Sequence, residues 1–263
     1  MKLSGADFTR FRHNDLDHLE KRLREAQGRK RLVIVDGVYS MSGDVADVAA
    51  MVELCERYHA WLFLDDAHGI GVLGEGGRGT AHAFQVADRV PVIMGVLGKA
   101  LGSVGGFIAG SHRLIDYMRH IARTYLFSAA LSPISAAASL AALRVLEREP
   151  HLPLRSLNFA DRARARFIEL GFDCGGSRSH IVPVYCGSDM RAITFWSGLE
   201  QQGVWSNPVF RPAVPPGREL LRNTFPASLD EQTFDEVLHA FGQLAFHVND
   251  AAPEPRHAQA LPA

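Results

Sequence analysis

The chain has 263 residues, of which 47% are hydrophobic and 22% are charged, and its formal net charge is −1. This composition predicts a globular protein with a full core, and the length allows one large or two modest domains. The near-zero charge and the lack of Lys and Arg clusters among aromatic residues argue against nucleic acid as a partner. No apolar stretch approaches the roughly 20 residues of a membrane span, and the first residues do not resemble a signal peptide, so we expect a cytoplasmic protein.

Apolar runs of strand length alternate with amphipathic runs of helical length in the first part of the chain. This alternation is typical of an α/β domain with a largely parallel sheet. Asp44 or Asp47 is expected to cap the first helix, and the last two strands are expected to be buried. In chain order, the patterns predict a strand at 32–35, a helix at 44–58, strands at 61–64, 90–96 and 106–109, and helices at 113–123 and 133–148.

The pattern changes after Pro150, where a smaller α+β unit is predicted. We therefore expect a large domain over residues 1–149 and a small C-terminal domain over residues 150–250. Residues 251–263 are rich in Ala and Pro and are expected to form a disordered tail. The predicted elements of the small domain are helices at 155–170, 190–202 and 230–246 and strands at 181–186 and 220–224.

Three polar motifs directly follow predicted strands. They are residues 36–41 (DGVYSM), residues 65–68 (DDAH) and Lys99. Parallel sheets bind ligands beyond the carboxyl ends of their strands, so these motifs mark a candidate site with carboxylates, an imidazole, an amine and a hydroxyl. The structural alternative is that Asp65 and Asp66 cap the following turn, as Asp side chains commonly do.

Lys99 is one of only four lysines in a chain whose positive charge comes mostly from arginine. It lies between an apolar run and a series of small residues. An amine can lose its proton, whereas a guanidinium cannot, and burial would lower the pKa of the amine enough for it to form an imine. The alternative is a lysine whose stem packs while its ammonium group reaches water.

Metal and disulfide chemistry are not indicated. An aspartate three residues before His68 could bind a metal, but no Glu or Cys stands at ligand spacing, so no metal is expected. Cys55, Cys174 and Cys186 are odd in number and lack CxxC spacing, which predicts inert core thiols. Residues 74–79 (GEGGRG) follow a loop rather than a strand, so we interpret them as a flexible loop and a Rossmann dehydrogenase as a weak alternative.

The order and spacing of these motifs resemble the α-oxoamine synthases, a family of pyridoxal 5'-phosphate enzymes. The resemblance covers about residues 3–248 and implies the aspartate-aminotransferase-like fold, PLP fold type I, with a mostly parallel sheet flanked by helices and a smaller C-terminal α+β domain. The matching blocks are residues 36–44 (DGVYSMSGD), 65–75 (DDAHGIGVLGE), 77–79 (GRG), 97–102 (LGKALG), 212–217 (PAVPPG) and 220–222 (LLR).

This resemblance implies a role for each motif that binds the cofactor. Lys99 would bind pyridoxal 5'-phosphate covalently and later act as the base that removes the α-proton of an amino acid. Asp65 would pair with the pyridine nitrogen. His68 and Ser40 would bind the phenolic oxygen of the ring. Ser128 would reach the phosphate held by the other subunit of a homodimer.

The reaction implied is the decarboxylative condensation of a small amino acid with an acyl-CoA, which gives an α-aminoketone. Arg222 would bind the substrate carboxylate as a bidentate fork. Which amino acid and which acyl thioester are used stays open. A catalytically silent subunit and an aminotransferase of the same fold are the alternatives.

The sequence also departs from the family pattern. The N-terminal region that normally precedes this point in the family is not in the chain, which predicts exposed apolar surface. Val96 and Ala129 stand where phosphate-binding hydroxyls are expected, and the block containing Arg211 is one residue short, so no role is assigned to Arg211. These departures remove donors that a phosphate dianion would need.

Overall fold

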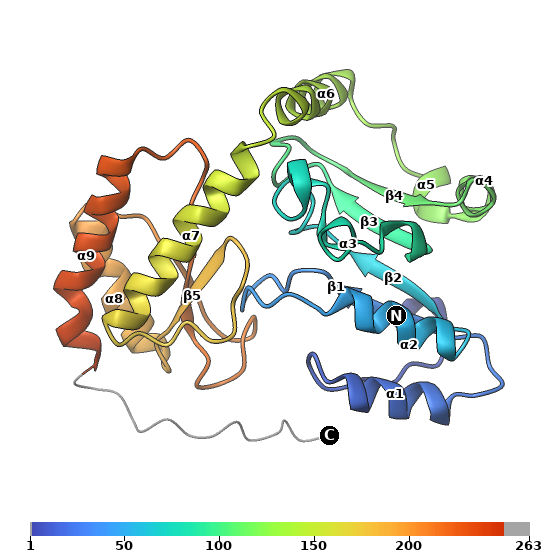
Figure 1. Cartoon of the computed structure of the whole chain (residues 1–263), viewed down its shortest axis with the longest axis horizontal. Helices are drawn as coiled ribbons and strands as arrows, with labels where there is room; N and C mark the ends of the chain where they lie inside the picture. Colours follow the sequence, from blue (N-terminus) through green and yellow to red (C-terminus); the bar gives the residue numbers. More distant parts are fainter. Residues whose placement is uncertain (1, 250–263) are drawn as a thin grey trace. The chain divides into compact units, whose positions relative to one another are not determined.

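The computed structural model describes residues 2–249, which form two compact units (Figure 1). Among the described residues, unit 1 comprises residues 2–39 and 45–154, and unit 2 comprises residues 40–44 and 155–249. The short segment 40–44 therefore belongs to the second unit, although it lies early in the sequence. The predicted tail, residues 251–263, lies outside the described residues.

Unit 1 is built on a four-stranded sheet with the order β1-β2-β3-β4. The first three strands are parallel and β4 is antiparallel to β3, so the sheet is mostly parallel, as predicted. The strands are β1 (Leu32–Asp36), β2 (Trp61–Asp65), β3 (Val92–Val96) and β4 (Gly106–Gly110), and the helices are α1 (Leu16–Glu25), α2 (Val48–Arg57), α3 (Thr80–Ala83), α4 (His112–Ile121), α5 (Arg123–Leu126) and α6 (Pro133–Arg148).

The strands β1 and β2 have one packed face and one face open to solvent. Residues of α1 and α2 form a single core cluster with the inward side chains of these strands. On the opposite face, Leu32 and Trp61 stand side by side in the strand register and are both exposed. Parallel strands are usually covered on both faces, so one layer of this sheet is uncovered within unit 1.

The predicted burial of β4 was wrong, because most of this strand is exposed. It forms the sheet edge opposite β1, beside α4 (Figure 1). The helices that follow β4 also leave large apolar side chains exposed, including Phe127 and Ile134. The exposed apolar surface expected from the sequence is therefore present.

The predicted helix 44–58 is shorter in the structure and begins at Val48. Asp47 is its cap, and the carboxylate of Asp47 accepts a hydrogen bond from the backbone nitrogen of Ala50 at 3.0 Å. Residues before Asp47 cannot be helical because Val45 forms a β-bridge with Val38. The cap thus fixes where the helix starts.

Unit 2 is an α+β arrangement in which three helices pack against an antiparallel sheet of order β5-β7-β6. Its core is rich in phenylalanine, and Phe167 of the first helix stacks on Phe241 of the last with 4.3 Å between the ring centroids. The sequence did not predict β6. The elements are α7 (Leu152–Glu169), β5 (Ile181–Tyr185), α8 (Asp189–Gln201), β6 (Asn207–Val209), β7 (Leu220–Thr224) and α9 (Glu231–Asn249).

The three cysteines are buried and unpaired, as predicted. Burial raises the pKa of the Cys55, Cys174 and Cys186 thiols to about 12, so all three stay protonated at neutral pH. Between residues 2 and 249, no helix is both long and apolar enough to cross a membrane. Within the same residues, no group of three or more His, Cys, Asp and Glu side chains is arranged to hold a metal ion.

Candidate active site

Asp65 is the last residue of β2 and lies at the centre of the carboxyl edge of the unit 1 sheet. In the strand register, it stands between Asp36 of β1 and Met94 of β3. Its Oδ1 accepts a hydrogen bond from the backbone nitrogen of Ala67 at 3.1 Å, so it caps the turn that carries His68. The turn-capping alternative is correct for Asp65, and the same turn brings His68 to the end of the strand.

Asp66 has a different role, because its carboxylate points into the protein and anchors the turn. It is 1% exposed and accepts hydrogen bonds from Thr80, at 2.7 Å from the backbone nitrogen and 2.5 Å from Oγ1. Burial raises the pKa of the Asp66 carboxyl group to about 6, and the two Thr80 hydrogen bonds partly counteract this effect. A Cβ atom at Gly69 would clash with both of these side chains, which explains glycine at this position.

Lys99 lies in a turn beyond β3 and is exposed, which agrees with the interpretation that its ammonium group reaches water rather than with a buried amine. The turn is closed by backbone hydrogen bonds from Leu97 to Gly105 and from Ser103 to Leu97, each at 2.9 Å. Leu101 is buried and anchors the turn from below. These bonds therefore fix the backbone that carries Lys99.

The Lys99 turn and the His68 turn lie against each other. Gly71 approaches so closely to Ala100, the neighbour of Lys99, that a Cβ atom at Gly71 would overlap the Ala100 methyl group. Ile70 likewise covers Gly95 in β3. The small residues in both segments thus allow the turns after β2 and β3 to meet.

Asp36 is a member of this site that the sequence analysis did not single out as a site residue. Burial raises the pKa of its carboxyl group, the nearby Asp65 carboxylate raises it further, and the Lys99 ammonium lowers it. Asp36, Asp65 and Lys99 therefore share one electrostatic environment at the carboxyl edge of the sheet. The signal available in the sequence was that Asp36 is the first residue of the DGVYSM motif, at the end of a predicted strand.

Ser40 and Arg222 come together within unit 2. Nε of Arg222, in β7, donates to the backbone oxygen of Ser40 at 2.6 Å. Burial lowers the pKa of the Arg222 guanidinium, although an arginine stays charged at any physiological pH. The sequence analysis named both residues but did not predict this bond, which uses the main chain of Ser40 rather than its hydroxyl group.

Two other predictions concern loops. Ser128 is exposed in the segment between α5 and α6, and its hydroxyl group is accessible within unit 1. The glycine-rich residues 74–79 were predicted to be a flexible loop, which missed the bonds that hold them: Gly71 donates to Gly77 at 2.7 Å and Gly79 donates to Leu73 at 2.8 Å. The short helix α3 begins directly after this loop and carries Thr80, the partner of Asp66.

The comparison with protein families decides where the chain belongs. The family described as aminotransferase class I and II matches residues 1–241. This chain belongs to the aminotransferase class I and II family. This result agrees with the fold that the sequence motifs predicted.

Curated relatives of this aminotransferase-family chain are α-oxoamine synthases, which confirms the resemblance. It is 40% identical to the 8-amino-7-oxononanoate synthase of Anaeromyxobacter dehalogenans over 97% of this chain and 63% of that protein. It is 38% identical to the serine palmitoyltransferase of Sphingobacterium spiritivorum over 90% of this chain and 59% of that protein. A putative 8-amino-7-oxononanoate synthase 2 of Mycobacterium tuberculosis is 43% identical over 93% of this chain and 32% of its own length.

Solved structures confirm the fold of this family member. The serine palmitoyltransferase of Sphingomonas wittichii superposes with a TM-score of 0.88 at 30% identity, over 94% of this chain and 63% of that one. A serine palmitoyltransferase structure that contains PLP as an internal aldimine superposes with the same TM-score over 93% of this chain and 62% of that one. The chain thus spans a third to just under two thirds of the length of these relatives.

Proposed function

We propose that the chain takes part in the pyridoxal 5'-phosphate-dependent, decarboxylative condensation of a small amino acid with an acyl-CoA. The carrying observation is the group at the carboxyl edge of the unit 1 sheet, where Asp36 stands beside Asp65 in the strand register and interacts electrostatically with the exposed Lys99. The names of the curated relatives support this reaction class over that of an aminotransferase.

The side chains at this edge fit the amine-binding and ring-binding parts of the cofactor. An accessible primary amine can form an imine with an aldehyde, and a carboxylate at a strand end can pair with a protonated pyridine nitrogen. The phosphate part has fewer donors, because Val96 carries no hydroxyl group and the Ser103 hydroxyl group already donates to the backbone of Ser135 at 2.8 Å. When bound, the cofactor would supply an electron sink for the carbanion of the amino acid.

The residues of unit 1 have separate tasks in this proposal. Lys99 would hold the cofactor and, as a free amine, would take the α-proton of the amino acid. Asp65 would keep a proton on the pyridine nitrogen, and the Ala67 hydrogen bond fixes the orientation of the Asp65 carboxylate. His68, from the same turn, would donate to the phenolic oxygen of the ring. Asp66, through its bonds to Thr80, keeps that turn in place.

Arg222 and Ser40 act from unit 2. The Nε of Arg222 is engaged by the Ser40 carbonyl group, which orients the guanidinium and leaves its two terminal nitrogens for the carboxylate of the amino acid. The Ser40 hydroxyl group is not used in that bond and is assigned to the phenolic oxygen of the cofactor. Both assignments rest on the family resemblance together with this local geometry.

A homodimer in the cytoplasm completes the proposal. The exposed apolar side chains of α5 and α6 lie on either side of Ser128, which we assign to the phosphate bound by the other subunit. An apolar surface of this kind is unusual for a soluble monomer and is typical of an interface. The two domains assigned to this proposal are the cofactor-binding large domain, residues 1–149, and the small domain, residues 150–250.

A visible absorption titration with pyridoxal 5'-phosphate tests the proposal. The parent chain is expected to show a saturable imine band, which Lys99→Ala abolishes. Lys21→Ala is the matched control, because Lys21 is an exposed residue of α1 whose ammonium group lies 4.0 Å from the Glu25 carboxylate. A folded parent without the band would overturn catalysis by this chain and favour a silent subunit.

A further inference from the structure

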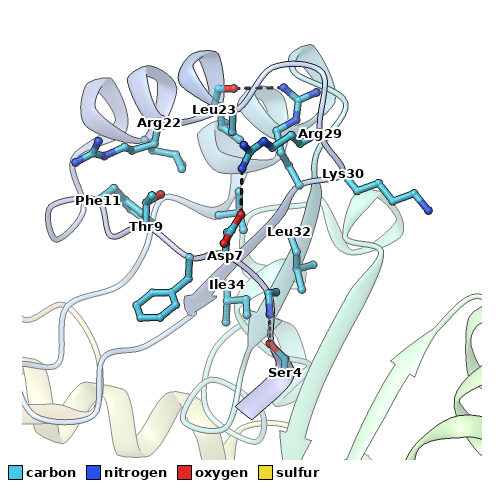
Figure 2. Close-up of a pocket in the computed structure, with 16 residues that line it drawn as sticks. Ser4, Asp7, Thr9, Phe11, Arg22, Leu23, Arg29, Lys30, Leu32 and Ile34 are labelled. Atoms are coloured by element: carbon cyan, nitrogen blue, oxygen red, sulfur yellow. Dashed lines mark hydrogen bonds and ion pairs between the residues drawn. The ribbon is translucent and has the colours of Figure 1, made fainter. Parts of the chain in front are cut away.

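The pocket beside β1 in unit 1 contributes no residue to the candidate active site. It has a volume of about 440 Å³, and its lining, which Figure 2 shows, comes from residues 4–11, 19–26 and 29–34. Asp65 and Lys99 lie outside this lining. The surroundings of Arg222, in unit 2, are more informative about the binding of the substrate.

Asn207 is a direct neighbour of Arg222 across the sheet of unit 2. In the antiparallel pair of β6 and β7, Asn207 stands opposite Arg222, and Pro183 of β5 stands opposite the same arginine on its other side. Residues that oppose each other in an antiparallel pair direct their side chains to the same face, with about 4.5–5.5 Å between their Cβ atoms. Asn207 is thus the polar one of the two side chains that flank Arg222.

The Asn207 side chain lies on the same face of the sheet as the bond between Arg222 and Ser40. Val209, two positions after Asn207 in β6, belongs to an apolar cluster against which Met41 packs. Because the side chains of a strand alternate between faces, Asn207 points to the same side as Val209. Met41 follows Ser40, whose carbonyl group accepts the bond from Nε of Arg222 at 2.6 Å. The amide and the guanidinium therefore face the same space.

The amide group of Asn207 is available to a ligand and its backbone is fixed. The side chain is exposed and, in the described part of the chain, forms no hydrogen bond. By contrast, the buried Asn223 accepts from the Ser206 hydroxyl group at 2.7 Å and donates to the Val182 oxygen at 3.0 Å. These bonds tie β6, β7 and β5 together one residue away from Asn207 and Arg222. The two side chains are thus held side by side before a ligand binds.

A primary amide beside a guanidinium suits a carboxylate ligand. The bond to Ser40 occupies Nε of Arg222 and leaves two terminal nitrogens for the ligand. A carboxylate has about four acceptor positions, so two parallel bonds from a guanidinium leave others unfilled. Nδ2 of Asn207 can donate to one of these positions without adding a charge. The two adjacent strands therefore offer a carboxylate three donors.

We propose that Asn207 is a further substrate-binding residue, whose Nδ2 donates to the amino-acid carboxylate that Arg222 binds. The inference rests on the proposed function, because it uses the role assigned there to Arg222. It adds a neutral donor from β6 to the charged one from β7. Together they make the free carboxylate of the amino acid a requirement for tight binding.

Binding of glycine and of methylamine, which is glycine without its carboxylate, tests the inference in the visible spectrum of the cofactor-loaded chain. Asn207→Ala should raise the Kd for glycine about tenfold, because it removes a hydrogen bond to a charged group, and should leave the Kd for methylamine unchanged. Asn207→Asp should raise the Kd for glycine further, because the two carboxylates repel each other. Asn158→Ala, at an exposed position of α7, is the matched control and should change neither value.

All three variants should retain the thermal transition and the cofactor affinity of the parent. Unchanged glycine binding by Asn207→Ala, or equal weakening of glycine and methylamine, would overturn the inference and leave the proposed function intact. A folded parent that does not bind the cofactor contradicts the proposed function instead.

The inference can then be decided without the cofactor, by nitrogen–proton NMR correlation spectra of the chain titrated with glycine. The signals of the Asn207 side-chain amide and of the Arg222 Nε–H group should shift together. A shift of the Arg222 signal alone, or of neither signal, contradicts the inference.

Discussion

The carboxylate of Asp66 accepts both hydrogen bonds that Thr80 can donate, one from its backbone nitrogen at 2.7 Å and one from Oγ1 at 2.5 Å. This pair joins the turn after β2 to the start of α3, and it is buried from solvent. It therefore links the candidate catalytic turn to the glycine-rich loop. The link also makes the stability of unit 1 sensitive to pH.

We expect the free energy of unfolding to fall as the pH rises through the range from about 4 to about 6. The pKa of Asp66 is about 6 in the native state and 3.8 in its ordinary state, so the native state binds the proton more tightly. Protonated Asp66 thus stabilises the fold below pH 4, and this contribution, about 3 kcal/mol at most, is lost as the pH passes the native pKa.

Urea unfolding at pH 4.5 and pH 7.5 measures this dependence. Asp66→Asn should remove that part of the pH dependence, and Asp235→Asn, at an exposed position of α9, should retain it. If Asp66→Asn unfolds with the pH dependence of the parent, another group is responsible.

Gly69→Ala should destabilise unit 1, whereas Gly242→Ala should stabilise unit 2. An added Cβ atom at Gly69 meets the side chains of Asp66 and Thr80, and the overlap should cost about 1–3 kcal/mol. At Gly242, within α9, the nearest atoms are Leu170 methyl groups at 3.9 and 4.0 Å, so the higher helix propensity of alanine should add about 0.5–1 kcal/mol. Thermal melting of the two variants measures both changes in stability. Equal changes at the two sites would contradict the steric explanation.

Arg222→Lys should weaken both the fold of unit 2 and the binding of the amino acid. Lysine cannot reproduce the Nε bond to the Ser40 carbonyl group, and the loss should lower the free energy of unfolding by about 1–3 kcal/mol. In an assay with saturating acyl-CoA, KM for the amino acid should rise more than kcat falls. Arg178→Lys, at an exposed position, is the control, and an unchanged KM in Arg222→Lys would remove Arg222 from the substrate site.

Phe127→Ser combined with Ile134→Ser should shift the chain toward the monomer. These side chains are 81% and 83% exposed in the chain by itself, so their replacement removes apolar area that a second subunit would cover. Sedimentation velocity at several concentrations measures the shift, with Met190→Ser in unit 2, also well exposed, as the control. A parent chain that is monomeric at every concentration would exclude this interface.

Most of the helices and strands could be predicted from the sequence, because the spacing of hydrophobic residues and the identity of capping residues are local properties. Neighbouring residues alone were enough to identify the strand at Leu32 and to narrow the helix cap to Asp44 or Asp47, of which Asp47 is the cap. The antiparallel direction of β4 and its exposure could not, because both depend on which segments pair across the sheet. The helix α1 was missed, although Asp15 caps it by accepting from His18 at 2.7 Å.

The candidate site shows the same division. Asp65, His68 and Lys99 could be placed together from their positions after strands, since parallel strands bring their carboxyl ends to one edge. The sequence allowed both a buried and an exposed Lys99, and the choice required the structure, in which Leu101 is buried and Lys99 is exposed. The different roles of Asp65 and Asp66 also required the structure, because Thr80 is distant in the sequence.

The membership of residues 40–44 in unit 2 determines how the two units could be expressed separately. Unit 2 is discontinuous, so no single cut in the gene releases it intact. A fragment that starts at Arg155 would lose the Ser40 carbonyl group that receives Arg222 and the Gly43 carbonyl group that receives the Ser179 hydroxyl group at 2.9 Å. Arg222 and Ser179 would then lack these hydrogen-bond acceptors. A recombinant small domain therefore needs residues 40–44, joined to it by a linker.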